Sequence, residues 1–158
     1  MRASCLSQSA LIVIPNLSAV SMVHHPIAYA ELLKEKIKKH GAHVWLVNTG
    51  WTGGPFGVGK RISIHHTRAL LNAALSGSLL DVKYRKDPVF GFEVPVQCDG
   101  VPSQILDPAN TWPSREEYFN KYDALAARFI ENFKLMVAEC PEHIREAGPQ
   151  RLATSCVR

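Results

Sequence analysis

The residues most suggestive of chemistry lie in and just after a glycine-rich loop over residues 49–59. Residues 54–61 read GPFGVGKR, which fits the GxxxxGK part of a phosphate-binding loop. In such loops backbone N–H groups surround the phosphates, lysine reaches the terminal ones, and a Ser or Thr hydroxyl holds magnesium. Arg61 stands at the hydroxyl position and cannot ligate a cation, and Pro55 lacks one N–H donor. We therefore favour two interpretations over a true Walker loop: a glycine turn packed against the core, or a loop that brings Lys60 and Arg61 close to an anion.

The distribution of charge supports an anion-facing segment without establishing one. The net charge of +4, from 18 Lys and Arg against 14 Asp and Glu, is too small to indicate nucleic-acid binding. However, no Asp or Glu occurs between Lys36 and Leu80. The cations there must pair with distant acids, face solvent or meet an anionic ligand, so a solvated basic face remains an alternative. These cations are Lys36, Lys38, Lys39, Lys60, Arg61 and Arg68.

Histidines and cysteines are the candidate metal ligands and nucleophiles. Histidines occur in close pairs at 24–25, 40/43 and 65–66, but neighbouring histidines on a helix point to different faces and no carboxylate accompanies them. We expect surface or packing histidines and no metal site. The four cysteines, at positions 5, 98, 140 and 156, form no CxxC pair, which favours reduced thiols in a cytosolic protein. No GxSxG nucleophile motif is present.

Length and composition indicate a single globular domain. The chain has 158 residues, of which 46% are hydrophobic and 20% charged, so a disordered or fibrous chain is unexpected. No apolar run approaches the roughly 18 residues that span a bilayer. Residues 1–21 are rich in serine and free of acids, as in a transit peptide, but Arg2 is the only basic residue before Lys34. We predict a cytoplasmic protein that binds neither nucleic acid nor membrane.

Periodicity predicts the elements that flank the glycine loop. Apolar residues recur every three or four positions over 27–41, which predicts a helix that ends at Gly41. Residues 43–48 form a continuous apolar run and predict a buried strand. After the loop, Ser63 is a suitable N-cap for a second helix that ends at Gly77. The side chains of that helix expected to face the core are those of Leu70, Leu71, Ala74 and Leu75.

The second half of the chain predicts two short strands and a long helix. The strands are expected over 81–84 and 89–96, and residues 100–113 are expected to form a loop. Ser114 begins a capping-box signature, and the helix after it is expected to be the longest and to end at Pro141. The fold class is therefore α/β (mixed α+β), without internal repeats. The apolar stripe of the long helix comprises Tyr118, Tyr122, Leu125, Phe129, Phe133 and Met136.

Several pieces of the sequence occur together, in this order, in one enzyme family. They are HPIAYAELLKEKIKKHGAHVWLVNTGWTGGPFGVGKRISIHHTRALLNAALSGSL, VFGFEVP, GVPSQILDPANTW and FIENF, of which NTGWTGG followed by GVGKR and TRA is the most specific. Through them, the stretch from Met22 to about Phe133 closely resembles the C-terminal part of ATP-dependent phosphoenolpyruvate carboxykinase. We therefore predict an unmatched tail over 1–21, a family domain fragment over 22–146 and a second tail over 147–158.

The resemblance implies a truncated, C-terminal mononucleotide-binding part of the phosphoenolpyruvate carboxykinase fold. The family converts oxaloacetate and ATP to phosphoenolpyruvate, carbon dioxide and ADP in gluconeogenesis, with magnesium and manganese. Its nucleotide pocket includes the positions that match Arg61, Ile62 and Thr67. Arg61 is expected to contact the charged side of the nucleotide, while Ile62 and Thr67 are expected to face the adenosine.

The resemblance also implies what this chain does not carry. The family's kinase P-loop, its metal-binding lysine, histidine and aspartate, and its oxaloacetate-binding arginine belong upstream of the counterpart of Met22. No such motif occurs here, so we expect no catalytic or metal-binding residue and little activity from this chain alone. The alternatives are a non-catalytic remnant that binds a nucleotide or anion, and a module that complements another chain.

Overall fold

The structure is a computed structural model that describes residues 24, 26–55, 57–134, 137, 140–146 and 148–151. The predicted N-terminal tail over 1–21 lies outside the described residues, as do residues 152–158 of the predicted C-terminal tail. Within the described part of the chain, no helix has both the length and the apolar character needed to cross a bilayer.

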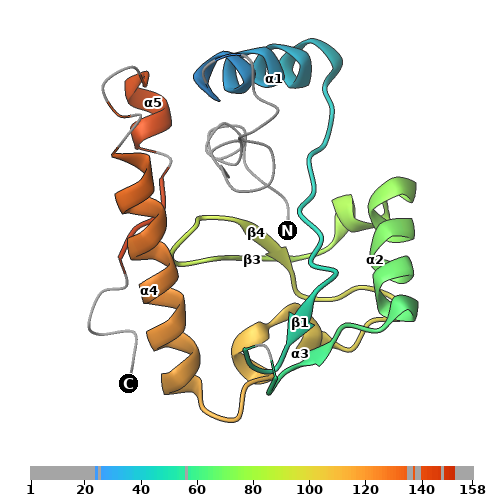
Figure 1. The fold of residues 1–158 in the computed structure, drawn as a ribbon. Helices are drawn as coiled ribbons and strands as arrows, with labels where there is room; N and C mark the ends of the chain where they lie inside the picture. Colours follow the sequence, from blue (N-terminus) through green and yellow to red (C-terminus); the bar gives the residue numbers. More distant parts are fainter. Residues whose placement is uncertain are drawn as a thin grey trace.

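Helices and two small sheets alternate along the chain, which confirms the mixed α and β fold class. The strands form two separate antiparallel pairs, β1 with β2 and β3 with β4. The β3–β4 pair lies in the middle of the molecule, between α4 and α2, and α1 crosses one end (Figure 1). The elements are α1 (Pro26–His40), β1 (Trp51–Thr52), β2 (Lys60–Arg61), α2 (Ile64–Ser76), the 3₁₀ helix η3 (Ser78–Asp81), β3 (Tyr84–Lys86), β4 (Glu93–Pro95), α3 (Ser103–Leu106), the 3₁₀ helix η4 (Pro108–Asn110), α4 (Arg115–Phe133) and α5 (Glu142–Arg145).

The ends of the first two long helices confirm the sequence prediction. Helix α1 ends before Gly41, which adopts a positive φ of 60°. Helix α2 begins after Ser63, whose hydroxyl accepts a hydrogen bond from the N–H of His66 at 3.2 Å, and it ends at the left-handed Gly77. The cap satisfies one of the N–H groups that a helix N-terminus leaves without an intrahelical partner.

The predicted inner face of α2 is only half correct. Leu70 and Ala74 pack against the core, but Leu71 is 42% exposed and Leu75 is 86% exposed. The reason is that the core covers one face of α2, which residues 69, 70, 73 and 74 occupy. The apolar residues of α2 extend around the helix beyond that face, so the outer ones remain in solvent.

The predicted buried strand over 43–48 is wrong for this structure. Residues 42–49 have no regular secondary structure apart from a bridge residue at Trp45, and residues 44–47 are half-buried. A continuous apolar strand is typical of the interior of a sheet with a neighbour on each side. In the described part of the chain, both sheets have only two strands and neither includes this segment.

The predicted short strands exist but are shorter than expected. Helix η3 occupies the start of the first, so β3 begins only at Tyr84. A turn occupies the start of the second, because the Asp87 carboxylate accepts hydrogen bonds from the N–H groups of Val89 and Phe90 at 3.0 and 2.7 Å. The predicted loop over 100–113 likewise contains α3 and η4.

Helix α4 starts where the sequence predicts but ends earlier. The Ser114 hydroxyl accepts a hydrogen bond from the N–H of Glu117 at 3.2 Å, which confirms the cap. The helix ends at Phe133, and Pro141 instead precedes the short helix α5. Of its predicted apolar stripe, Leu125 is 43% exposed and Met136 lies outside the described residues.

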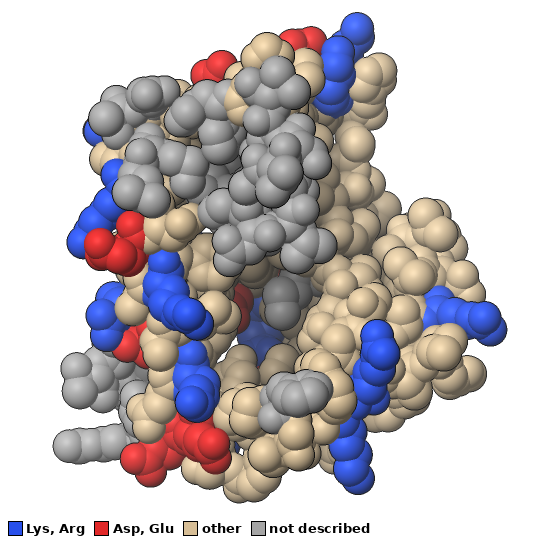
Figure 2. All heavy atoms as spheres, viewed as in Figure 1, with Lys and Arg blue, Asp and Glu red and all other residues tan. Residues whose placement is uncertain are grey.

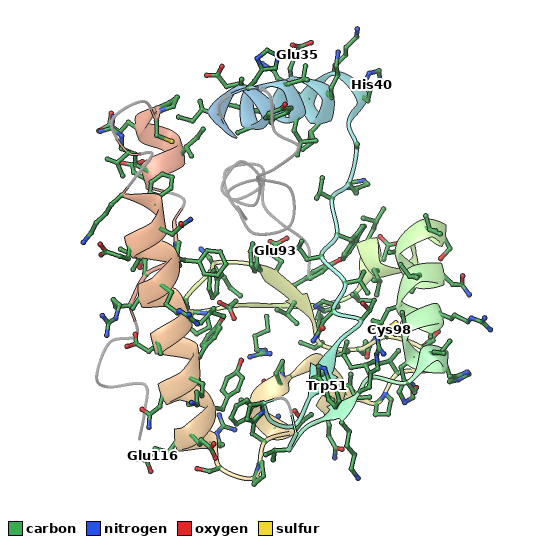
Figure 3. The ribbon with its side chains drawn as sticks, viewed as in Figure 1. Glu35, His40, Trp51, Glu93, Cys98 and Glu116 are labelled. Carbon is green, nitrogen blue, oxygen red and sulfur yellow. The ribbon has the colours of Figure 1, made fainter. Side chains whose placement is uncertain are left out.

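Two clusters of side chains support the elements around the β3–β4 pair. The aliphatic cluster contains Leu79, Cys98, Val101 and Leu106, and Figure 3 shows Cys98 beside α2. The aromatic cluster surrounds Phe90, whose ring lies 5.4 to 5.9 Å from the rings of Phe92, Tyr122 and Phe129. The first cluster supports α2 and α3, and the second fixes α4 against the β3–β4 pair.

Candidate functional site

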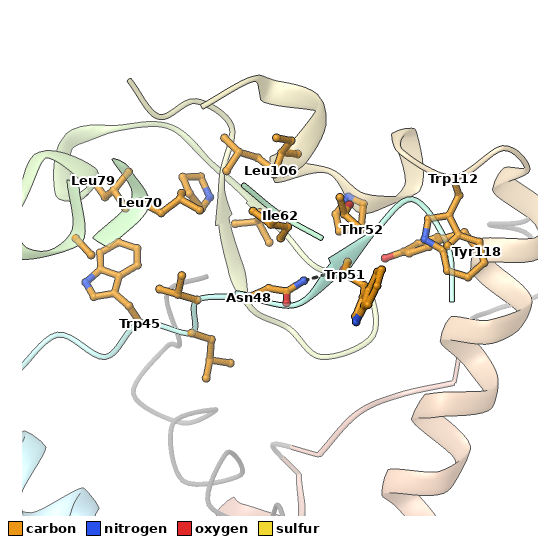
Figure 4. Close-up of a pocket in the computed structure, with 18 residues that line it drawn as sticks. Trp45, Asn48, Trp51, Thr52, Ile62, Leu70, Leu79, Leu106, Trp112 and Tyr118 are labelled. Atoms are coloured by element: carbon orange, nitrogen blue, oxygen red, sulfur yellow. Dashed lines mark hydrogen bonds between the residues drawn. The ribbon is translucent and has the colours of Figure 1, made fainter. Parts of the chain in front are cut away.

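A cavity of about 260 Å³ opens between the extended segment 45–48, the β1–β2 hairpin, α2 and α3 (Figure 4). Its wall is mostly apolar and includes three tryptophans. The polar side chains that line it are Asn48, Thr52 and Tyr118. An apolar cavity with a few polar groups is typical of a small-molecule site, but an incomplete core has the same character. The apolar wall includes Trp45, Trp51, Trp112, Ile62, Leu70 and Leu106.

The side chain of Asn48 orders the turn that leads into the hairpin. Its Oδ1 accepts a hydrogen bond from the N–H of Gly50 at 2.9 Å, and its Nδ2 donates to the carbonyl of Trp51 at 3.3 Å (Figure 4). The carbonyl of Gly50 in turn accepts from the N–H of Ile62 at 2.9 Å. These bonds hold Ile62, which is only 8% exposed, in the wall of the cavity.

The glycine loop is the tip of a β-hairpin and not a phosphate cradle. Trp51 pairs with Arg61 and Thr52 with Lys60 across the hairpin. A Cβ on Gly59 would lie 2.5 Å from the carbonyl oxygen of Gly54, so only glycine fits there. In a P-loop the glycines lead directly into a helix, whereas here β2 separates them from α2. The structure therefore excludes the Walker interpretation, as Arg61 already indicated.

The three predicted site residues lie close in sequence but differ in what they face. Ile62 lines the cavity. Arg61 is exposed on β2 and has no ion pair with any carboxylate among the described residues. Thr67 is half-buried in the first turn of α2, where its N–H donates to the carbonyl of Ser63 at 3.0 Å. Neither Arg61 nor Thr67 lines the cavity, and the roles of all three stay predictions.

A basic surface borders this site. Lys60, Arg61 and Arg68 are exposed on β2 and α2. Figure 2 shows Lys and Arg side chains over this region, on the right of the view, with no acidic side chain beside them. In the same view, acidic side chains lie over α4 and α1 and in the hollow at the centre. On the face seen in Figure 2, the acid-free stretch of sequence therefore presents basic side chains without acidic neighbours.

The aromatic walls of the cavity were not predicted from the sequence. The Trp45 ring stacks on Tyr84, with ring centres 6.5 Å apart, and the Trp112 ring meets Tyr118 edge-on at 5.7 Å. These neighbours hold both indole rings in place. The only local signal was the tryptophan of NTGW beside the glycine loop. The other aromatic residues come from distant parts of the chain, so no local pattern joins them.

Tyr118 combines burial with nearby charge. Burial, together with the negative charges of Asp87 and Asp107, raises the pKa of Tyr118 to about 12, although Arg85 opposes the effect. Arg85 itself forms an ion pair with Asp107, with an N–O distance of 3.2 Å. The phenol is protonated near neutral pH and can donate a hydrogen bond at the cavity wall, and the raised pKa extends this state to more alkaline pH.

The histidines and cysteines form no metal centre in the described part of the chain. There, no three His, Cys, Asp or Glu side chains come close enough to hold a metal ion. The Nδ1 of His66 lies 3.1 Å from the carbonyl oxygen of Gly100, which gives this histidine a packing role. Cys98 and Cys140 are buried free thiols, and burial raises the pKa of each. Cys5 and Cys156 lie outside the described residues.

Comparison with known proteins identifies the family. A family model described as phosphoenolpyruvate carboxykinase matches residues 15–104. The chain is 53% identical over 126 residues to phosphoenolpyruvate carboxykinase (ATP) from Thermus thermophilus. The aligned region covers 80% of this chain and 24% of that relative. The chain is also 49% identical over 128 residues to the protein of the same name from Rhizobium etli. That aligned region covers 81% of this chain and 24% of the relative.

The matched region is therefore long and the identity is high. The chain belongs to the phosphoenolpyruvate carboxykinase family, as the resemblance of its motifs predicted. It spans about a quarter of the length of the curated relatives that it matches.

The raised pKa of Tyr118 predicts how stability depends on pH. The folded-state pKa of about 12 exceeds the ordinary value of 10.0, so folding favours the protonated phenol. The free energy of unfolding should therefore lose this contribution as pH rises from 10 toward 12, and keep it below pH 10. Urea unfolding between pH 8 and pH 11.5 should show a shallower decline for Tyr118→Phe than for the parent chain. Identical pH slopes would contradict the assignment.

Proposed function

We propose that this chain is a segment of an ATP-dependent phosphoenolpyruvate carboxykinase and supplies part of the pocket for the adenine nucleotide. The complete enzyme would convert oxaloacetate and ATP to phosphoenolpyruvate, carbon dioxide and ADP, in gluconeogenesis. Family membership supports the assignment, because relatives that share about half of the aligned residues carry this name. The buried free thiols of Cys98 and Cys140 support a cytoplasmic location.

The observation that carries this proposal is the contrast between two neighbouring residues. Arg61 presents an exposed cation without a partner among the described acids, while Ile62 is buried in the cavity wall. A nucleotide has the matching asymmetry, with charged phosphates at one end and a flat, largely apolar base at the other. Arg61 would meet the phosphate side, because guanidinium forms charge-assisted hydrogen bonds with phosphate oxygens.

Ile62 and Thr67 would face the adenosine. Ile62 brings an apolar side chain to a cavity that also has aromatic walls, which suits a purine. Thr67 lies in the first turn of α2, four residues after the Ser63 cap, and its hydroxyl could bond the nucleoside. The apolar wall would exclude water from the base, and Arg61 would oppose the phosphate charge.

Magnesium and manganese are expected for the family, but the described residues do not fit them. They bring together no three side chains of the types that ligate such ions. We therefore assign no step of the reaction to a metal held by this chain.

A second candidate function is a module that complements another chain, and one observation favours it. Large apolar side chains are exposed around the cavity and on α2, including Trp51 at 45%, Ile64 at 72% and Leu75 at 86%. Exposed apolar side chains gathered in one region are typical of protein interfaces. The partner would be a polypeptide that carries the family sequence absent from this chain.

Replacement of Arg61 tests the nucleotide site. We expect Arg61→Ala to weaken ATP binding about tenfold, because it removes a charge-assisted hydrogen bond to phosphate. Lys86→Ala, which removes an exposed cation from β3, should change the affinity less than about twofold. Calorimetric titration at fixed salt concentration measures both. Equal losses in the two variants would indicate nonspecific charge attraction and would argue against a pocket at Arg61.

An assay of phosphoenolpyruvate formation separates the two candidate functions. The purified chain alone should show no oxaloacetate-dependent turnover, because it lacks the motifs for the phosphate cradle and the metals. Addition of the missing three-quarters, taken from a relative as a separate polypeptide, should restore turnover if this chain complements a partner. ATP binding without restored turnover would favour the nucleotide-binding remnant. Turnover by the chain alone would overturn the view that its site is incomplete.

A further inference from the structure

The hydroxyl of Thr111 joins two segments that are far apart in the sequence. It lies 2.9 Å from the hydroxyl of Thr52 and 3.1 Å from the N–H of Gly53, 59 and 58 residues earlier. It also donates to the carbonyl of Pro108 at 2.8 Å. Thr52 ends β1 and Gly53 is the first residue of the hairpin tip between β1 and β2, whereas Thr111 directly follows η4.

These three hydrogen bonds use the full capacity of one hydroxyl. Thr111 has one O–H donor, which serves Pro108, and two lone pairs. One lone pair accepts the N–H of Gly53 and the other accepts the O–H of Thr52. The backbone approaches closely as well, because a Cβ on Gly53 would lie 3.0 Å from the carbonyl oxygen of Thr111. The contact is therefore specific for a hydroxyl on one side and a glycine on the other.

The position of this contact determines what it holds. Thr52 pairs directly with Lys60, and the neighbouring pair of the same ladder joins Trp51 to Arg61. Each strand of the hairpin has only two residues, and a two-stranded ribbon that short has little stability of its own. Thr52 also lines the cavity, and Figure 4 shows it between Ile62 and Trp112. Whatever fixes Thr52 therefore fixes Arg61 and Ile62.

We propose that Thr111 is a positioning residue for the nucleotide site: through Thr52 and Gly53 it holds the β1–β2 hairpin so that Arg61 and Ile62 face the ligand. The inference rests on the proposed nucleotide site. The hydrogen bonds of the Thr111 hydroxyl to Thr52, Gly53 and Pro108, which we call the Thr111 clamp, are themselves independent of any ligand. Thr111 does not line the cavity and acts only through its neighbours in the hairpin.

Three variants test the clamp. Thr111→Val keeps the shape and removes all three hydrogen bonds, and Thr111→Ser keeps the hydroxyl. Thr49→Val, which removes an exposed threonine hydroxyl from the segment just before β1, is the matched control. Hydrogen exchange of backbone amides reports on the hairpin without a ligand. We expect about fivefold faster exchange at residues 51–53 and 60–62 in Thr111→Val only, with α4 unchanged.

ATP affinity, measured by calorimetry on the same proteins, tests the link to the site. Thr111→Val should raise the ATP dissociation constant about fivefold, whereas Thr111→Ser and Thr49→Val should match the parent chain. A role limited to global stability would lower the unfolding midpoint and leave both the local exchange pattern and the affinity of the folded protein unchanged. That result would overturn the proposal.

The remaining outcomes separate this inference from the proposed function. Faster hairpin exchange with unchanged ATP affinity would show that the clamp does not position the ligand, and would also overturn the proposal. Failure of the parent chain to bind ATP would refute the nucleotide site, while the exchange data would still decide whether Thr111 holds the hairpin. If Thr111→Val does not fold, Thr52→Val removes one of the three bonds and should show a smaller effect at the same amides.

Discussion

The candidate site depends on one short-range constraint, the hydrogen bonds between the Thr111 hydroxyl and the β1–β2 hairpin. The hairpin carries the exposed cation of Arg61 and leads into the buried Ile62, yet its strands are too short to fix their own position. The aliphatic core supports the site from the α2 side, and the aromatic cluster supports α4, from which Tyr118 reaches the cavity. The Thr111 clamp connects these supports at the point where β1 leads into the hairpin tip.

Local signals predicted the capped helix ends well, but not the end of α4, which lies at Phe133 and not at Pro141. Ser63, Gly77 and Ser114 act within a few residues of themselves, so their capping roles can be read directly from the sequence. Burial is different, because it depends on which partner covers a face. Leu75 fits a helical apolar pattern and is nevertheless exposed, and the apolar run over 43–48 forms no regular strand. Both features would suit a chain with further family sequence packed against it.

The site could be predicted only in part. The residue type at position 61 was sufficient to argue against a magnesium-binding loop, and the hairpin explains why the GxxxxGK pattern misleads. The roles of Arg61, Ile62 and Thr67 came from the family resemblance, because no rule of spacing assigns them. The aromatic walls and the Thr111 clamp join residues up to 73 positions apart, such as Trp45 and Tyr118, so only the folded structure brings them together.

A crystal structure of this chain with a slowly hydrolysed ATP analogue tests the account most directly. The account predicts that the Arg61 guanidinium contacts phosphate oxygens while Ile62 packs against the purine, with the hydrogen bonds between Thr111 and the hairpin intact. An empty cavity, with Arg61 paired to a carboxylate of the chain itself, would contradict it.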